Sequence, residues 1–203
     1  MNYITALKTS EPVAFGGFSS LHIIDGRACK VLEDGCYNDV LQECLMQAQA
    51  ADAGLAPKVH SVFEMADDVV VVMDAIDFTT NRHPETGEDD GAPCLLGEML
   101  EDEMIRASKL YARLIKAGIL HCDFHAGNII LADDGNDFAI DYGIASTIGT
   151  APLKHLNRAA IFLLPVLERL DMISESSQIR AAYNDADELR ALLPQIADLL
   201  ISF

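Results

Sequence analysis

The stretch HCDFHAGNIILADDGNDFAIDYG, residues 121–143, decides the fold. Residues 128–132 and 137–140 are mostly apolar and are predicted to form two strands. An Asp-Gly pair between them is a strong signal for a tight hairpin turn. Such a hairpin would return Asp141 to the side of Asn128, so these two polar residues are expected to lie together.

The polar residues of this stretch resemble two motifs of protein kinases. His121, Asp123 and Asn128 match the catalytic loop HxDxxxxN, and Asp141-Tyr142-Gly143 resembles the metal-binding DFG, with Tyr in place of Phe. Phosphoryl transfer needs a carboxylate to orient and deprotonate the acceptor hydroxyl, which is the role expected of Asp123. It also needs oxygen ligands for Mg²⁺, the roles expected of Asn128 and Asp141, whereas His121 should support the loop. The alternative is a polar turn followed by an acidic hairpin, but two motifs in order at hairpin spacing favour a kinase.

A kinase also needs a lysine on an early strand to hold the α- and β-phosphates of ATP, and a helix glutamate to position it. Arg27-Ala28-Cys29-Lys30 occupies the place of the VAIK motif, so Lys30 is the candidate lysine. Glu43 lies on a helix predicted over residues 37–53 and is the candidate glutamate, with Glu33 as its rival. A solvated lysine and a solvated glutamate are the alternative interpretation.

The remaining nucleotide contacts are expected from a loop and a strand end. The segment Gly16-Gly17-Phe18-Ser19 keeps only the middle glycine of the phosphate-covering GxGxxGxV, and an ordinary turn is the alternative. Its glycines would permit close backbone approach to phosphate, and its serine could donate a hydroxyl. Residues 72–76 are predicted to run into a hinge, where backbone groups of Asp74 and Ile76 could bind adenine.

The whole chain is predicted to be one α+β domain with a minimal, bilobal, protein-kinase-like fold. The expected parts are a strand-rich N-lobe over 1–76, a linker over 77–93 and a reduced helical C-lobe over 94–203. Predicted strands lie within 13–33 (two, around Asp25-Gly26), 58–63 and 69–73; further helices are predicted over 98–117, 153–170 (kinked at Pro165) and 185–201.

Composition limits the partners. The formal charge of −18 disfavours nucleic acid and anionic membranes, and requires that ATP be held by local cations, a metal or N–H groups. Five cysteines without a CxxC pair disfavour a disulfide framework or a zinc site. No apolar run is long enough to span a membrane, no signal peptide is visible, and a monomer is expected.

Several residues depart from ordinary protein kinases. Cys122 replaces the arginine that often pairs with an activation-loop phosphate, which implies activity without that phosphorylation. His125 gives the pattern HxDxHxxN of aminoglycoside-type phosphotransferases, although a structural histidine is equally ordinary. No APE motif follows Gly143, and only 60 of the 203 residues remain after it. Three hydroxyls in the following loop could accept phosphate: Ser146, Thr147 and Thr150.

A compact acidic kinase with GGFSS at 16–20, HCDFHAGN at 121–128 and DYG at 141–143 resembles the HopBF family of bacterial type III secreted effectors. The resemblance implies a serine/threonine kinase that uses ATP and Mg²⁺, is secreted into the host-cell cytoplasm, and phosphorylates and inactivates the heat-shock protein 90 chaperone. Two alternatives stay open. One is a small-molecule phosphotransferase. The other is a non-catalytic binding module, which the retained lysine, aspartates and asparagine disfavour.

Overall fold

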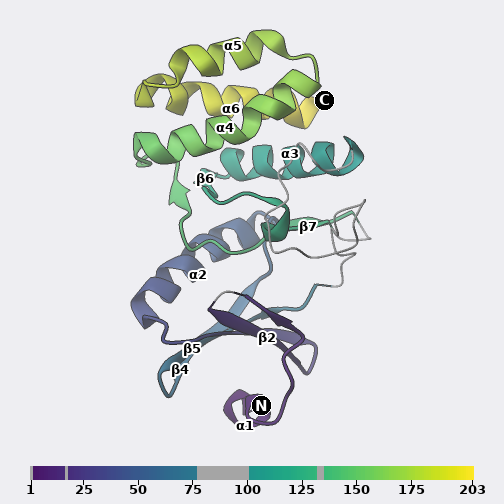
Figure 1. The fold of residues 1–203 in the computed structure, drawn as a ribbon, viewed down its shortest axis with the longest axis vertical. Helices are drawn as coiled ribbons and strands as arrows, with labels where there is room; N and C mark the ends of the chain where they lie inside the picture. Colours follow the sequence, from purple (N-terminus) through teal and green to yellow (C-terminus); the bar gives the residue numbers. More distant parts are fainter. Residues whose placement is uncertain (1, 17, 77–100, 132–134) are drawn as a thin grey trace. The chain divides into compact units, whose positions relative to one another are not determined.

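The computed structural model describes residues 2–16, 18–76, 101–131 and 135–203 of the chain. The chain divides into two compact units, Met1–Asp77 and Phe78–Phe203 (Figure 1). The first unit is strand-rich and the second is mostly helical, which confirms the predicted α+β class. The predicted linker over 77–93 and the first residues of the helix predicted from 98 lie outside the described residues.

The first unit contains a five-stranded antiparallel sheet with the strand order β1-β2-β3-β5-β4. The turn between β2 and β3 consists of Asp25 and Gly26, both at positive φ, as a two-residue hairpin turn requires. The sequence predicted two strands in this region and the structure has three, because β1 is too short to show an alternating pattern. The strands are β1 (Ala14–Phe15), β2 (Ser19–Ile24), β3 (Arg27–Leu32), β4 (Val59–Met65) and β5 (Asp68–Asp74).

Two helices cover the opposite faces of this sheet, as Figure 1 shows. Helix α1 (Tyr3–Leu7) packs on the face that carries Cys29 and Val31 of β3. Helix α2 (Tyr37–Asp52) packs on the other face through Val40 and Cys44. Because successive side chains of a strand point to opposite faces, Lys30 lies on the α2 side. The β5 run from residue 69 to 72 is buried on both faces, which explains why it is all valine.

The described residues of the second unit form four α-helices and two small sheets. Helix α6 contacts α3, α4 and α5, and its buried leucines, with those of α3 and α4, form the core of the unit. The helices are α3 (Glu101–Lys116), α4 (Leu153–Arg169), α5 (Ile173–Ala182) and α6 (Ala186–Ser202), and the strands form the pairs β6 (Ile119–Leu120) with β9 (Ser146–Thr147) and β7 (Ile129–Leu131) with β8 (Asp137–Ala139).

The predicted helices and hairpin of this unit are confirmed, with α4 continuing through Pro165. Helix α5 and the β6–β9 pair were not predicted. Helix α5 buries only Ser176, Ile179 and Ala182, so its sequence lacks a strong apolar stripe, and its packing against α4 and α6 supports it instead. None of the helices in the described ranges is long and apolar enough to span a membrane.

Candidate active site

The catalytic-loop candidates lie in the second unit, between β6 and β7. A 3₁₀ turn, η2 (Ala126–Asn128), leads directly into β7. The N–H group of Ile140 donates to the carbonyl oxygen of Asn128 at 3.0 Å, next to the β7–β8 ladder. Asp141 therefore follows immediately after the residue that is bonded to Asn128. The predicted juxtaposition of Asn128 and Asp141 by the hairpin is thus present in the backbone.

His121 is completely buried and connects the loop to the Asp141-Tyr142-Gly143 segment. Its Nε2–H donates to the carbonyl oxygen of Ile140 at 2.8 Å, and its ring packs edge-on against Tyr142 and Phe124. Burial lowers the pKa of this imidazole, so the ring is neutral near pH 7. A neutral, inaccessible histidine cannot act on a substrate. It holds the loop in place, which is the role that the sequence suggested.

Asp123 and Asn128 are joined by their own contacts. The amide nitrogen of Asn128 donates to the backbone carbonyl of Asp123 at 2.9 Å and lies 3.4 Å from a carboxylate oxygen of Asp123. Because the nitrogen is engaged, the amide oxygen of Asn128 is the atom that could bind a metal. The Asp123 side chain is 51% exposed, so a substrate hydroxyl can approach it.

His125 has a structural place within this loop. It caps the 3₁₀ turn, with Nδ1 accepting the N–H of Gly127 at 3.1 Å. Since Nδ1 accepts, the neutral ring carries its proton on Nε2, which lies 3.9 Å from the Asp123 carboxylate. The HxDxHxxN pattern therefore has a local structural explanation in this chain.

Two residues of the loop have positive φ angles, Cys122 at 65° and Asp141 at 64°. Aspartate tolerates this left-handed conformation, but it is uncommon for cysteine. Non-glycine residues in this region cost about 1–3 kcal/mol each and gather at functional sites. The strain lies at the residue before Asp123 and at the candidate metal ligand Asp141, which is exposed.

An aromatic cluster that the sequence did not predict packs against the catalytic loop at Phe124. Phe124 packs on Tyr111 of α3 and Phe162 of α4, with ring centroids 4.6–4.9 Å apart. Tyr142, in the position of the DFG phenylalanine, is 1% exposed, and its burial raises the pKa of its phenol. These rings fix the loop to two helices, but a sequence alone does not show which aromatic residues meet.

The first unit contains the candidate lysine and its partner. Lys30 on β3 forms an ion pair with Glu43 on α2, with Nζ and Oε1 3.2 Å apart. The two side chains are only 20% and 14% exposed. The rival Glu33 lies beyond the end of β3 and is exposed. The structure thus brings Lys30 together with Glu43, across the face of the sheet that α2 covers.

The candidate phosphate loop is the turn between β1 and β2. The N–H of Gly16 donates to the carbonyl of Ser19 at 2.7 Å. A Cβ at residue 16 would meet the Ser19 hydroxyl oxygen at 2.7 Å, so a larger residue there would require the Ser19 side chain to turn away. Phe18 is 84% exposed, and Gly17 lies outside the described residues.

The prediction that backbone groups of Asp74 bind adenine is limited by the hydrogen bonds that this residue already makes. Its backbone N–H donates to Lys58 at 3.0 Å, and its carboxylate bonds to Arg27 and His60, of which His60 is the larger cause of its lowered pKa. Only the carbonyl of Asp74 remains a candidate for adenine. Ile76 is half-buried and lies after the end of β5.

The metal ligands fit magnesium rather than a soft metal. Within the described ranges, no group of three or more His, Cys, Asp or Glu residues is arranged to hold a metal ion. Mg²⁺ in phosphoryl-transfer sites needs no such cage, because one or two protein oxygens and the nucleotide phosphates suffice. The amide oxygen of Asn128 and the carboxylate of Asp141 are ligands of that kind.

The fold and these residues define the class of the protein, which is kinase-like. Residues 98–166 match the family model of the ABC1 atypical kinase-like domain. The match spans 69 of the 203 residues and includes α3, the loop with Asp123 and most of α4. It supports an atypical kinase-like protein, with the ATP and Mg²⁺ use that this implies. It does not test the narrower resemblance to the HopBF family. No curated protein matches the chain significantly.

Proposed function

We propose that the chain is a protein kinase that transfers the γ-phosphoryl group of ATP to a serine or threonine hydroxyl. The observation that carries the proposal is the half-exposed carboxylate of Asp123, which lies 3.4 Å from the amide nitrogen of Asn128 on a loop that buried His121 connects to Ile140. A carboxylate positioned in this way is suited to accept the proton of an attacking hydroxyl.

The proposed roles follow from the contacts. Lys30, oriented by Glu43, binds the α- and β-phosphates, and backbone groups of the β1–β2 turn cover them. Asn128 and Asp141 hold Mg²⁺, which neutralises charge on the phosphates when bound. Asp123 orients the acceptor hydroxyl and takes its proton. The acceptor oxygen–phosphorus bond forms, the bond from γ-phosphorus to the β–γ bridging oxygen breaks, and ADP leaves.

A narrower proposal comes from the resemblance to the HopBF effectors. On that basis the kinase is secreted by a type III system, acts as a monomer in the host-cell cytoplasm, and phosphorylates a serine of heat-shock protein 90, which it inactivates. The charge of −18 supports a protein substrate over nucleic acid or an anionic membrane.

The second candidate is a small-molecule phosphotransferase, which the HxDxHxxN pattern favours. The capping role of His125 offers a structural reason for the same residue and weakens that argument. A non-catalytic binding module is the third, and it does not explain why Lys30, Asp123, Asn128 and Asp141 are all retained.

Labelling with radioactive ATP in a eukaryotic lysate tests the proposal. The wild-type protein should label protein bands, including one at the size of heat-shock protein 90. Asp141→Ala should reduce this label by about 100-fold or more, because a metal ligand is lost. Asp102→Ala removes an exposed carboxylate from α3 and serves as the charge-matched control. Label confined to small metabolites would favour the second candidate, and equal label with Asp141→Ala would contradict the catalytic assignment.

A further inference from the structure

We infer that the acceptor segment is acidic, and that Lys154 and Arg158 at the start of α4 bind a carboxylate or phosphate beside the accepted hydroxyl. The inference rests on the proposed kinase function, because it names the substrate class of the same site. It assigns a binding role to two residues that resemble no part of the kinase motifs.

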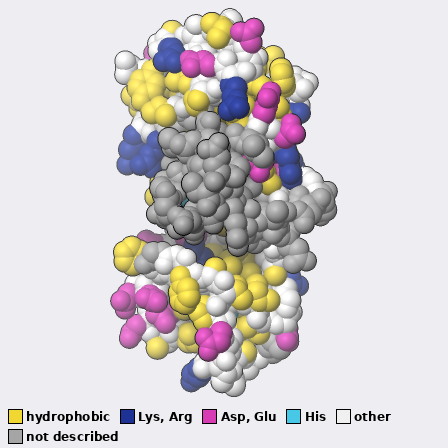
Figure 2. All heavy atoms as spheres, turned by 45° about the vertical axis from the view of Figure 1, so that its right-hand side comes forward, with side chains coloured by type: hydrophobic (Ala, Val, Ile, Leu, Met, Phe, Trp, Pro, Cys, Tyr) yellow, Lys and Arg dark blue, Asp and Glu magenta, His cyan; other side chains and the backbone are white. Residues whose placement is uncertain are grey.

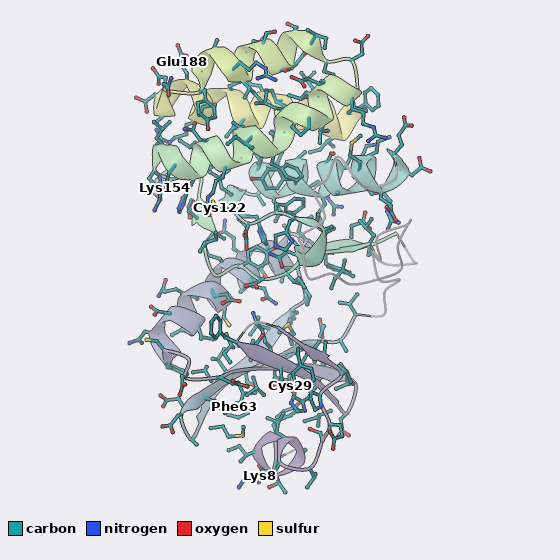
Figure 3. The ribbon with its side chains drawn as sticks, in the orientation of Figure 1. Lys8, Cys29, Phe63, Cys122, Lys154 and Glu188 are labelled. Carbon is teal, nitrogen blue, oxygen red and sulfur yellow. The ribbon has the colours of Figure 1, made fainter. Side chains whose placement is uncertain are left out.

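The first turns of α4 lie against the loop that carries Asp123. The guanidinium of Arg158 donates through Nη1 to the backbone carbonyl of Cys122 at 3.2 Å, one residue before Asp123. Lys154 is four residues earlier, on the same face of the helix. Figure 3 labels Lys154 and Cys122, which lie close together in the second unit. Both cationic side chains are exposed.

The two charges act on the same small region. The charges of Arg158, Asp123 and Lys154 all shift the pKa of the Cys122 thiol, which burial raises most. Lys154 and Arg158 also help burial to lower the pKa of His155, which bonds to Ser146 at 3.0 Å. An anion bound here would therefore meet two cations next to Asp123. The hydroxyl of Ser146 and the imidazole of His155 lie in the same region.

Four other cations of this unit are neutralised by ion pairs. Arg106, Lys116, Arg180 and Arg190 each form an ion pair with an aspartate or glutamate. Among the residues that the structure describes, neither Lys154 nor Arg158 is paired with a carboxylate. Figure 2 shows Lys and Arg side chains at several separate places on the visible face of this unit. In a chain with a charge of −18, the two cations Lys154 and Arg158 are the feature that an acidic segment would recognise.

The net negative charge of the protein means that an acidic segment can be attracted only at short range. The overall field of the protein repels an acidic partner, so the attraction must come from direct pairing with these two side chains. Such exposed pairs are worth little individually and are weakened by salt. We therefore expect a preference of a few-fold per charge, rather than an absolute requirement.

Peptide binding to the full chain tests this directly, by fluorescence anisotropy. The probes are four labelled peptides that differ only beside one serine, which is flanked by aspartate, phosphoserine, alanine or lysine. Wild-type protein should bind the aspartate or the phosphoserine peptide several-fold more tightly than the alanine peptide, and the lysine peptide most weakly. Raising the salt concentration should reduce this difference.

Variants test whether Lys154 and Arg158 cause the preference for acidic peptides. Lys154→Ala should weaken binding of the preferred acidic peptide about three-fold and leave the alanine peptide unchanged. Lys8→Ala removes the same charge from an exposed residue of the first unit and should have no effect. Arg158→Lys keeps the positive charge and should retain the acidic preference, whereas Arg158→Ala should reduce it by a few-fold, as Lys154→Ala does. The KM for ATP should stay constant in Lys154→Ala.

Each outcome decides the inference. Equal binding of all peptides by the wild-type protein overturns it, and so does an acidic preference that survives Lys154→Ala and Arg158→Ala together. An increase in the KM for ATP in place of weaker peptide binding would assign the cluster to the nucleotide and also overturn it. Tighter binding of the phosphoserine or of the aspartate peptide shows which anion the cluster prefers. Failure of the kinase proposal appears separately, as acidic peptides that bind but are never phosphorylated.

Discussion

At the scale of single residues, His121 shows how a histidine in a catalytic motif is used for structure. Its one strong hydrogen bond joins the loop with Asp123 to the residue before Asp141. Burial lowers its pKa below the usual value of 6.5. Just below pH 6.5 the unfolded chain therefore binds a proton at this residue and the folded chain does not.

This pKa shift predicts acid sensitivity. The free energy of unfolding should fall as the pH drops below about 6.5, by up to about 1.4 kcal/mol per pH unit from this group. Urea unfolding between pH 5 and pH 7.5 measures the slope in the wild-type protein and in His121→Asn. The variant should be less stable at pH 7.5 but show a shallower slope. An identical slope in both proteins would mean that His121 is not held neutral by burial.

The sequence identified some of these residues but not others. Lys30, Asp123, Asn128 and Asp141 could be found because their spacing follows the chemistry of phosphoryl transfer. The choice of Glu43 over Glu33 needed the packing of α2 on the sheet. Arg158 could not be found at all, because nothing in its local sequence indicates that it meets the carbonyl of Cys122.

At the scale of elements, the hairpin with Asn128 and Asp141 at its ends packs on α3 and forms an ion pair with it. Arg106 donates through Nε to Asp137 at 3.2 Å and makes a second bond through Nη2 to the other carboxylate oxygen. Asp137 is 7% exposed, whereas the Arg106 side chain is 39% exposed. Loss of the arginine would leave a nearly buried carboxylate without this partner.

Arg106→Ala should therefore destabilise the protein. Breaking a fully buried pair costs about 3–5 kcal/mol, and the exposure of Arg106 to solvent reduces the expected cost to about 1–3 kcal/mol. Urea unfolding at pH 7 measures the change. Arg113→Ala, an exposed arginine two turns later on α3, is the matched control and should change stability by less than about 0.5 kcal/mol. Equal effects of the two substitutions would show that the Arg106–Asp137 pair does not anchor the hairpin.

Elements with a strong local signal were predictable. The apolar stripe of α2, the turn at Asp25-Gly26 and the termination of α3 before Gly118 could all be inferred from the sequence. The two-residue strands β1, β6 and β9 were not predicted, since β1 is too short to show a pattern and β6 and β9 form only by pairing with each other across 26 or more residues of sequence. The β6–β9 pair matters for the site because it places Ser146 opposite Leu120, next to the catalytic loop.

At the scale of the whole molecule, the residues that we propose for the reaction are divided between the two units. The first has the Lys30–Glu43 pair, and the second has Asp123, Asn128 and Asp141. In the second unit, aromatic residues of α3 and α4 pack against Phe124 and so hold the catalytic loop. The family match to an atypical kinase-like domain covers residues 98–166 of this unit, which include α3 and the catalytic loop but neither α5 nor α6.

The most direct test separates ATP binding from phosphoryl transfer in purified wild-type protein and Asp123→Asn. Thermal unfolding with Mg²⁺ and ATP at 100 times the Kd should show a stabilisation of about 2.7 kcal/mol in both proteins. In a single-turnover assay with a serine peptide, Asp123→Asn should transfer phosphate at least about 100-fold more slowly, because the proton acceptor is lost. Transfer at the wild-type rate by Asp123→Asn, or no stabilisation of the wild-type protein by Mg²⁺ and ATP, would contradict the account.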